Sequence, residues 1–136
     1  MAEINLKNET AEAEPIHIGF LLIENFTMLA LAAAMEPLRM ANQLAGKHLY
    51  SWSLIGASPE AVTASDGIRI MPDHTVNDSA DYDIVFVVSG INVMENYQAQ
   101  EVRWLRSLVG RVKTVGALCT GPYLLAKAGL LDGYTC

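Results

Sequence analysis

The sequence predicts an α/β fold, a three-layer sandwich around a mainly parallel sheet. Three apolar runs without polar alternation, residues 16–23, 83–90 and 112–118, are typical of strands that are covered on both faces. Segments with helical spacing separate these runs, and strands that alternate with helices favour a parallel sheet. The chain has 136 residues, which suffice for one domain with a hydrophobic core.

The first half of the chain supplies the first strand, a long helix and a second strand. Residues 1–14 are polar and acidic, and we expect them to form a flexible arm before the strand at 16–23. Ala, Leu and Met recur at helical spacing over residues 28–45, and Gly46 follows at the point where a helix would end. Residues 50–57 alternate more strongly and predict a strand near an edge of the sheet.

The second half continues the alternation. In residues 64–73, the pair Asp66-Gly67 predicts the turn of a hairpin. Residues 100–109 form an amphipathic pattern that predicts a helix. A further helix is expected over residues 122–128, because Pro122 suits a first turn and Gly129 suits the position after the last one. The final residues, "LLDGYTC", predict a turn and then the opening of a new strand.

Composition narrows the classes of function. The formal net charge is −6 and the pI is about 4.9, so the chain by itself is a poor candidate for binding nucleic acid. Cys119 and Cys136 form no CxxC pair and no metal-ligand spacing, which argues against a disulfide framework and predicts a reducing, cytoplasmic setting. Neither a metal nor another cofactor is expected.

No membrane segment is expected either. The N-terminal residues are acidic where a secretion signal would be basic and then apolar. Glu24 and Asn25 interrupt the apolar stretch over residues 18–35, and each half is too short to cross a bilayer.

Distinctive residues follow three of the predicted strands. The segments are "ENF" after the first, "SGIN" after the strand that ends near residue 90, and "CTG" after the strand that ends at residue 118. Parallel strands end at one edge of a sheet, and ligands bind there. We therefore expect a ligand-binding site lined by Glu24, Asn25, Phe26, Gly90, Ile91, Asn92, Cys119, Thr120 and Gly121.

Cys119 stands at a predicted corner between strand and helix. Gly116 precedes it and Gly121 follows it, and such glycines allow a strained residue to project its side chain into a cleft. Backbone N–H groups at a helix start favour an anion and lower the pKa of a thiol. The spacing G-x-x-C-x-G thus has the physical properties of a nucleophile elbow. The alternative is a cysteine that serves only as a small buried apolar residue.

Three longer segments carry a resemblance to a known family. "GALCTGPYLLAKAGLLDG" resembles the elbow of the PfpI-like superfamily, also described as class I glutamine amidotransferase-like domains. "FLLIENFTMLALAAAMEPLRMAN" and "ASDGIRIMPDHTVNDSADYDIVFVVSG" resemble its first helix and central section. More narrowly, they resemble the ligand-sensing half of AraC/XylS-type transcriptional regulators. "MEPLRMANQLAGKHLYSWSLI" resembles the subgroup that responds to arginine or to quaternary amines such as carnitine and glycine betaine.

The resemblance covers nearly everything after Pro15 and has consequences for the whole protein. It implies a flavodoxin-like, class I glutamine amidotransferase-like fold that is incomplete at its C-terminus, with residues 15–136 as part of a sensor domain. At least one more strand and helix would follow, and then a basic helix-turn-helix domain through which alone DNA would be contacted. It also implies a homodimer.

The resemblance bears on catalysis as well. Enzymes of the superfamily take an acid from the loop or helix start after the first strand, and those positions fall here on Thr27 and Ala30. Some also use a histidine directly after the cysteine, where this chain has Thr120. Glu24 could point into the cleft, whereas Glu36 lies well into the helix and is expected to be a structural hydrogen-bonding residue or a surface residue. The sequence holds three histidines, all expected to be exposed: His17, His48 and His74.

We therefore expect no catalytic residue. Cys119 is expected to line a pocket for a small zwitterionic or amine ligand. The alternative is a cysteine-dependent enzyme of the hydratase or amidase type. A chaperone or glyoxalase-type protein of the same superfamily would also need an acid beside the thiol.

Overall fold

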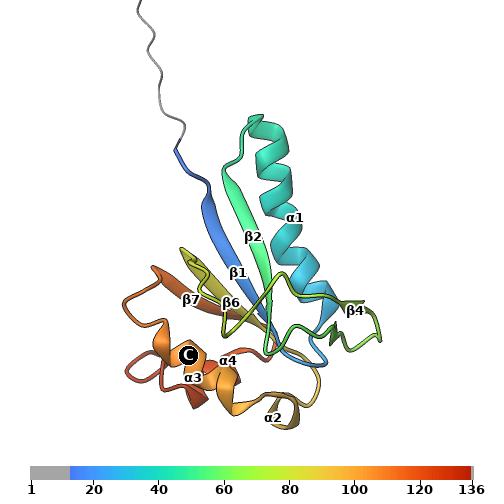
Figure 1. Cartoon of the computed structure of the whole chain (residues 1–136), viewed down its shortest axis with the longest axis vertical. Coiled ribbons are helices and arrows are strands. Elements are labelled where there is room, and N and C mark those ends of the chain that lie inside the picture. The colour runs from blue at the N-terminus through green and yellow to red at the C-terminus, as the bar shows by residue number, and fades with distance from the viewer. Residues whose placement is uncertain (1–12, 136) are drawn as a thin grey trace, which may run out of the picture.

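A five-stranded parallel sheet forms the centre of the computed structural model, which describes residues 13–135. The strands lie in the order β5-β2-β1-β6-β7, and every neighbouring pair is parallel (Figure 1). The predicted α/β class is confirmed. Most of the predicted flexible arm, residues 1–12, lies outside the described residues, as does Cys136. The strands of this sheet are β1 (Ile16–Leu22), β2 (Tyr50–Gly56), β5 (His74–Thr75), β6 (Ile84–Val88) and β7 (Thr114–Leu118).

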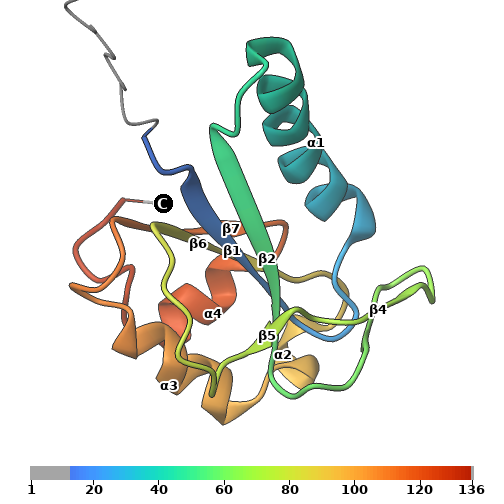
Figure 2. The ribbon, with the colours of Figure 1, turned by 45° about the horizontal axis from the view of Figure 1, so that its top comes forward.

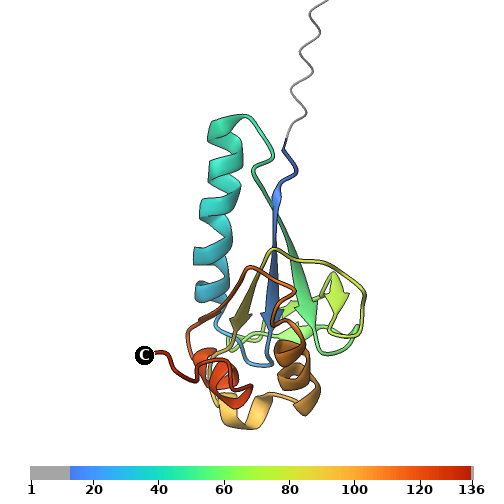
Figure 3. The same cartoon turned by 90° about the vertical axis from the view of Figure 1, so that its left-hand side faces the viewer.

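Helices cover both faces of the sheet. Helix α1 (Met28–Ala45) lies along β1 and β2 on one side (Figures 1 and 3), and α3 (Ala99–Ser107) and α4 (Pro122–Lys127) pack on the other. Helix α1 has the predicted bounds, and Gly46 ends it in the left-handed conformation with φ 61°. The predicted hairpin is also present, as β3 (Val62–Thr63) and β4 (Arg69–Ile70). Two short elements, β5 and α2 (Val93–Asn96), were not predicted.

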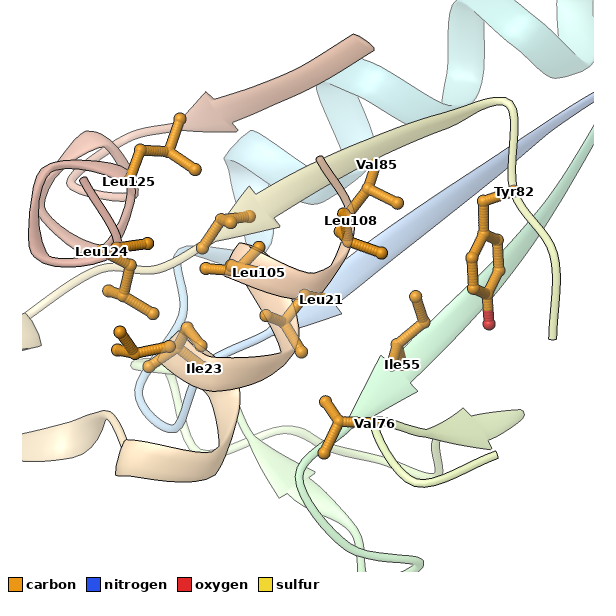
Figure 4. Packing of buried hydrophobic residues seen from close by; sticks show 13 residues of the cluster. Leu21, Ile23, Ile55, Val76, Tyr82, Val85, Leu105, Leu108, Leu124 and Leu125 are labelled. Carbon is orange, nitrogen blue, oxygen red and sulfur yellow. The ribbon is translucent and has the colours of Figure 1, made fainter. Parts of the chain in front are cut away.

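Two hydrophobic clusters hold the layers together. Leu21 and Ile23 pack with residues of α3 and α4, such as Leu105 and Leu124, in one cluster (Figure 4). Phe20 and its alternate neighbours on β1 pack toward α1 in the other. Side chains alternate between the two faces of a strand, so both faces of β1 are buried. This double burial explains the uninterrupted apolar run from which the strand was predicted.

His17 differs from the prediction that all three histidines are exposed. It is half-buried, with Nδ1 2.7 Å from Ser51 Oγ and Nε2 3.0 Å from Ser53 Oγ. Its ring also stacks on Tyr82 with the centroids 5.3 Å apart. The parallel pairing of β1 with β2 places His17 beside Ser51, which is a long-range contact that a strand-start position does not reveal. His48 is exposed and His74 is half-exposed.

The segment after α4 contains the predicted turn, within residues 128–133, but the predicted opening of a strand is not formed at residues 134–135. Through residue 135 no strand follows α4, and Gly129 and Gly133 have φ of 75° and 84°. A strand needs a neighbour with which to pair, and the described chain supplies none there.

Beside the edge strand β7 lies a groove of about 420 Å³, lined by apolar side chains that include Val112, Leu130 and Leu131. No helix within residues 13–135 is long and apolar enough to cross a membrane.

Candidate functional site

The three predicted strand ends meet at the carboxyl edge of the sheet, as expected (Figure 2). Phe26, in the loop after β1, forms an antiparallel bridge with Gly90 after β6. The Thr27 N–H donates to the Ser89 carbonyl at 3.3 Å in the same place. Thr27 also lies beside the residue that follows β7, because its Oγ1 is 3.4 Å from Cys119 Sγ. Chain segments more than sixty residues apart thus form one site.

Cys119 itself is the strained residue at this corner. Its φ is 58°, in the left-handed region that non-glycine residues seldom adopt. Among residues 13–135, the other non-glycine residues with positive φ are Asn25 at 62° and Asn92 at 52°. All three lie just beyond the ends of β1, β6 and β7. Backbone strain gathers at functional sites, so its concentration here marks this edge as the candidate site.

The flanking glycines are required by close packing. A Cβ on Gly121 would lie 2.6 Å from the Val87 carbonyl oxygen, and one on Gly116 would lie 2.6 Å from the Phe86 ring. Neither glycine has a positive φ. The corner needs glycine, as predicted, but for a different physical reason. The glycines allow β7 and α4 to approach β6, while the strained torsion belongs to the cysteine.

The thiol faces a hydroxyl group. Cys119 is exposed, and within residues 13–135 Thr27 is the side chain that hydrogen-bonds its sulfur. Thr27 is the position where the resemblance places the acid of the enzymes, so the structure brings that position to the thiol and supplies Oγ1 there. A threonine hydroxyl neither accepts a proton as a base nor delivers one as an acid near neutral pH. Glu36, the acidic residue of α1, forms an exposed ion pair with Arg39, with Nε and Oε2 2.7 Å apart.

Thr120 joins β7 to β6 and does not present its proton to the site. Its hydroxyl donates to the Gly90 carbonyl at 2.7 Å, and Ser89 Oγ lies 2.8 Å away. Because a hydroxyl has one proton, the Ser89 hydroxyl is the donor in the second contact. Ser89 is fully buried and was not among the predicted site residues. The sequence signal for it is its position directly after the apolar run that forms β6.

Glu24 belongs to a neighbouring acidic cavity. Its carboxylate accepts from the Thr63 N–H at 3.3 Å, and it lines a cavity of about 120 Å³ together with Glu60 and Glu101. Glu24 and Thr27 are three residues apart on one loop, which therefore connects the cavity to the elbow. Within residues 13–135 no group of acidic, histidine or cysteine side chains is arranged to hold a metal ion.

Glu101 is a member of the acidic cavity that the sequence did not reveal. It lies on α3, is only 2% exposed, and accepts a hydrogen bond from the Gln98 N–H at 2.6 Å. Burial raises the pKa of its carboxyl to about 7, against the opposing effect of the Gln98 hydrogen bond, and the charge of Glu24 raises it further. The only sequence signal for Glu101 is the capping pattern with Gln98 three residues before it.

The other predicted residues have different surroundings. Phe26 is fully buried in the cluster under α1, so it contributes backbone to the site. Ile91 is 59% exposed, and its carbonyl accepts from the Asn96 side chain at 3.0 Å. Cys119, Gly90, Thr120 and Gly121 are gathered at the elbow, and Asn25 and Asn92 lie on the strained loops that follow β1 and β6.

We expect Thr120→Val to destabilise the protein by about 2 kcal/mol. The change removes the hydroxyl that satisfies Ser89, and leaves a fully buried Oγ without a partner. Ser89→Ala removes that orphaned group, so the double variant should be less destabilised than the sum of the two single variants. Urea unfolding of the four chains measures this coupling. Strict additivity would contradict the described contact.

Comparison with known proteins gives this geometry a context. A model of the DJ-1/PfpI family matches residues 19–136. The chain belongs to the DJ-1/PfpI family. This domain is 44% identical over 122 residues to the HTH-type transcriptional regulator GbdR of Pseudomonas aeruginosa, and the match covers 90% of this chain and 33% of GbdR. The PfpI-like resemblance and its narrower, AraC-type form are confirmed.

An enzyme is also among the relatives of this DJ-1/PfpI domain. It is 31% identical over 121 residues to the isonitrile hydratase of Pseudomonas putida, with 87% of this chain and 50% of that enzyme covered. The fold of this chain is similar to that in the crystal structure of an AraC family transcriptional regulator from Pseudomonas putida. The TM-score is 0.76 at 23% identity, over 90% of this chain and 65% of that one. The chain spans about a third of the length of GbdR.

Proposed function

We propose that this DJ-1/PfpI domain senses a small molecule within a transcriptional regulator and performs no catalysis of its own. The observation that carries the proposal is the pair formed by Thr27 Oγ1 and Cys119 Sγ at 3.4 Å. The elbow has the strained geometry of an enzyme's nucleophile, and the residue beside the thiol cannot serve as its acid or base. The regulators among its relatives support the same conclusion.

The ligand in this proposal is a small zwitterion or amine, as in the quaternary-amine and arginine subgroup that the sequence resembles. Glu24, Glu60 and Glu101 line one cavity, and the carboxylates of Glu24 and Glu60 would attract a cationic group. Residues of the elbow would form the other part of the site, reached along the loop from Glu24 to Thr27. Control of amino-acid or quaternary-amine metabolism is the role that such a ligand implies.

DNA binding belongs to another part of the protein in this proposal. The chain carries a formal charge of −6, and its relatives with helix-turn-helix names are about three times as long as the matched segment. A basic helix-turn-helix domain would bind DNA, and a homodimer would present two such domains to paired half-sites in the cytoplasm. The groove beside β7 would be covered by further strand and helix from the same polypeptide.

The alternative function is a cysteine-dependent hydratase or amidase, which the likeness to isonitrile hydratase favours. The two functions differ in their demand on Cys119. An enzyme requires the thiolate as nucleophile, whereas a sensor requires only a side chain of similar size in the site.

We expect no thiol-dependent turnover of isonitriles, amides or glyoxals. The expectation follows from the hydroxyl of Thr27 at the position of the missing acid. Product formation by the wild-type chain and by Cys119→Ser, followed under identical conditions, tests it. Turnover that the wild-type chain sustains and the serine variant loses would overturn the sensor proposal. Alkylation of Cys119 alone would not, since an exposed thiol can react without being catalytic.

A further inference from the structure

An open pocket of about 390 Å³ lies between α3 and α4, and basic side chains line it. The two helices lie side by side on one face of the sheet (Figures 1 and 2). Arg103 and Arg106 are three residues apart on one face of α3, and Lys127 is the last residue of α4. Among residues 13–135, no acidic side chain lines this pocket, and its other lining residues are Tyr97, Ala99 and Val102.

Basic residues are concentrated in this part of an otherwise acidic chain. Residues 102–131 contain five of the nine lysines and arginines and none of the fifteen acidic residues. Arg103, Arg106 and Lys127 are exposed, and within residues 13–135 none of them forms an ion pair. Like charges around one pocket repel one another, and an anion bound among them would relieve that repulsion. The net charge of −6 therefore does not describe this face of the molecule.

Two of the three cationic side chains are held in place by other groups. The Arg106 guanidinium donates from Nε to the Ala128 carbonyl at 3.2 Å and from Nη2 to the Lys127 carbonyl at 3.0 Å. Lys127 Nζ lies 5.5 Å from the centroid of the Tyr123 ring, which packs edge-on against Tyr97. Side chains that are already oriented lose less conformational entropy when a ligand binds. The pocket is thus partly arranged for binding before any ligand arrives.

The donors in the pocket fit a phosphate group better than a single carboxylate. A phosphate monoester carries close to two negative charges above pH 7, and three of its oxygen atoms accept hydrogen bonds. Three cationic side chains match these oxygens, and guanidinium groups bind phosphate through paired N–H donors. A carboxylate has one charge and two oxygens, so it would leave one cation without a partner. Tyr97 and Val102 offer carbon atoms against which the organic part of a ligand would pack.

We propose that the pocket between α3 and α4 binds the phosphate group of a phosphorylated small molecule. The pocket shares no lining residue with the acidic cavity that contains Glu24. Helix α4 begins beside the elbow and ends at Lys127, so the pocket and the elbow lie at opposite ends of one helix. The inference does not depend on the sensing proposal, and either of them could fail while the other stands.

Phosphorus NMR of phenyl phosphate, a phosphate monoester, tests the proposal at pH 8 and low ionic strength. We expect the wild-type chain to broaden the phosphate resonance in a saturable way. Arg103→Gln and Lys127→Gln should each weaken binding about tenfold, because each removes a charge-assisted hydrogen bond. Lys127→Arg keeps the charge and should retain most of the affinity. Arg106 is left unchanged, because its hydrogen bonds to α4 also support the fold.

Arg111→Gln is the matched control for these variants. Arg111 is an exposed base of the same region and does not line the pocket, so its loss should change the affinity by less than about twofold. Thermal melts should show that every variant folds, since all altered positions are exposed. Equal broadening by the wild-type chain and Arg103→Gln, or equal losses in Arg103→Gln and Arg111→Gln, would overturn the proposed site.

Two competing anions test the class of ligand. Acetate should displace phenyl phosphate much less effectively than inorganic phosphate does, and equal displacement would overturn the assignment to phosphate. A short DNA duplex should bind no more tightly than phenyl phosphate, because the acidic remainder of the chain repels a polyanion. Tighter binding of the duplex that is lost in Arg103→Gln would overturn the assignment to a small molecule.

Discussion

Gly90→Ala should destabilise the protein by about 3 kcal/mol and disrupt the elbow. A Cβ at this position would lie 2.4 Å from the Asn25 carbonyl oxygen and 2.9 Å from the Thr27 nitrogen. Both are backbone atoms of the loop that places Thr27 beside Cys119, so they cannot swing aside as the end of a flexible side chain could. The methyl group must push this loop away from β6, which breaks the Phe26–Gly90 bridge.

Two measurements check this expectation. Urea unfolding gives the loss of stability, and the rate of Cys119 alkylation reports whether the loop has moved from the thiol. Gly46→Ala is the matched control, because its Cβ would meet nothing within 4 Å and the strain of its φ of 61° is its only penalty, about 1 kcal/mol. Equal losses of stability in the two variants would contradict the close approach at Gly90.

Glu101→Gln should remove a dependence of stability on pH that amounts to roughly 3 kcal/mol. Burial raises the pKa of the Glu101 carboxyl from 4.5 to about 7 in the folded protein. The contribution of the protonated group is complete below about pH 4.5 and is lost as the pH rises through 7. The free energy of unfolding should therefore fall across this interval in the wild-type chain, relative to the variant.

The glutamine variant isolates this group from others that titrate nearby. Its side-chain oxygen can still accept from the Gln98 N–H, and histidines contribute equally to both chains. Above pH 7 the variant should be the more stable chain. Glu60→Gln, an exposed acid of the same cavity, should show little of this effect. A stability difference between wild type and Glu101→Gln that stays constant from pH 4.5 to 8 would contradict the buried, neutral state.

Local signals in the sequence were sufficient for most of the fold. The doubly covered strands, the helix that ends at Gly46 and the hairpin at Asp66-Gly67 each follow from patterns within a few residues. The opening of a strand that was predicted after the turn in residues 130–133 is not formed at residues 134–135, because a strand depends on a neighbour that the local pattern does not supply. The two short elements, β5 and α2, have too few residues to produce a periodic pattern.

The location of the site could be predicted from the sequence, but most of its side-chain contacts could not. Parallel strands end at one edge, so the meeting of the three loops could be foreseen. The partners of individual side chains could not, because they depend on distances between chain segments. Thr120 contacts Ser89 and Gly90, and Glu24 belongs to the acidic cavity. Glu101 enters that cavity from α3, and the capping pattern with Gln98 does not indicate this position.

Saturation-transfer NMR on a mixture of the protein with glycine betaine, carnitine and arginine tests the central claim most directly. One sample reports both binding, through transfer to ligand protons, and catalysis, through new resonances. The sensor account predicts transfer to at least one of these amines, its persistence in Cys119→Ser, and an unchanged ligand spectrum over hours. Transfer to none of the three, or a product that forms with Cys119 and fails to form with the serine variant, would contradict it.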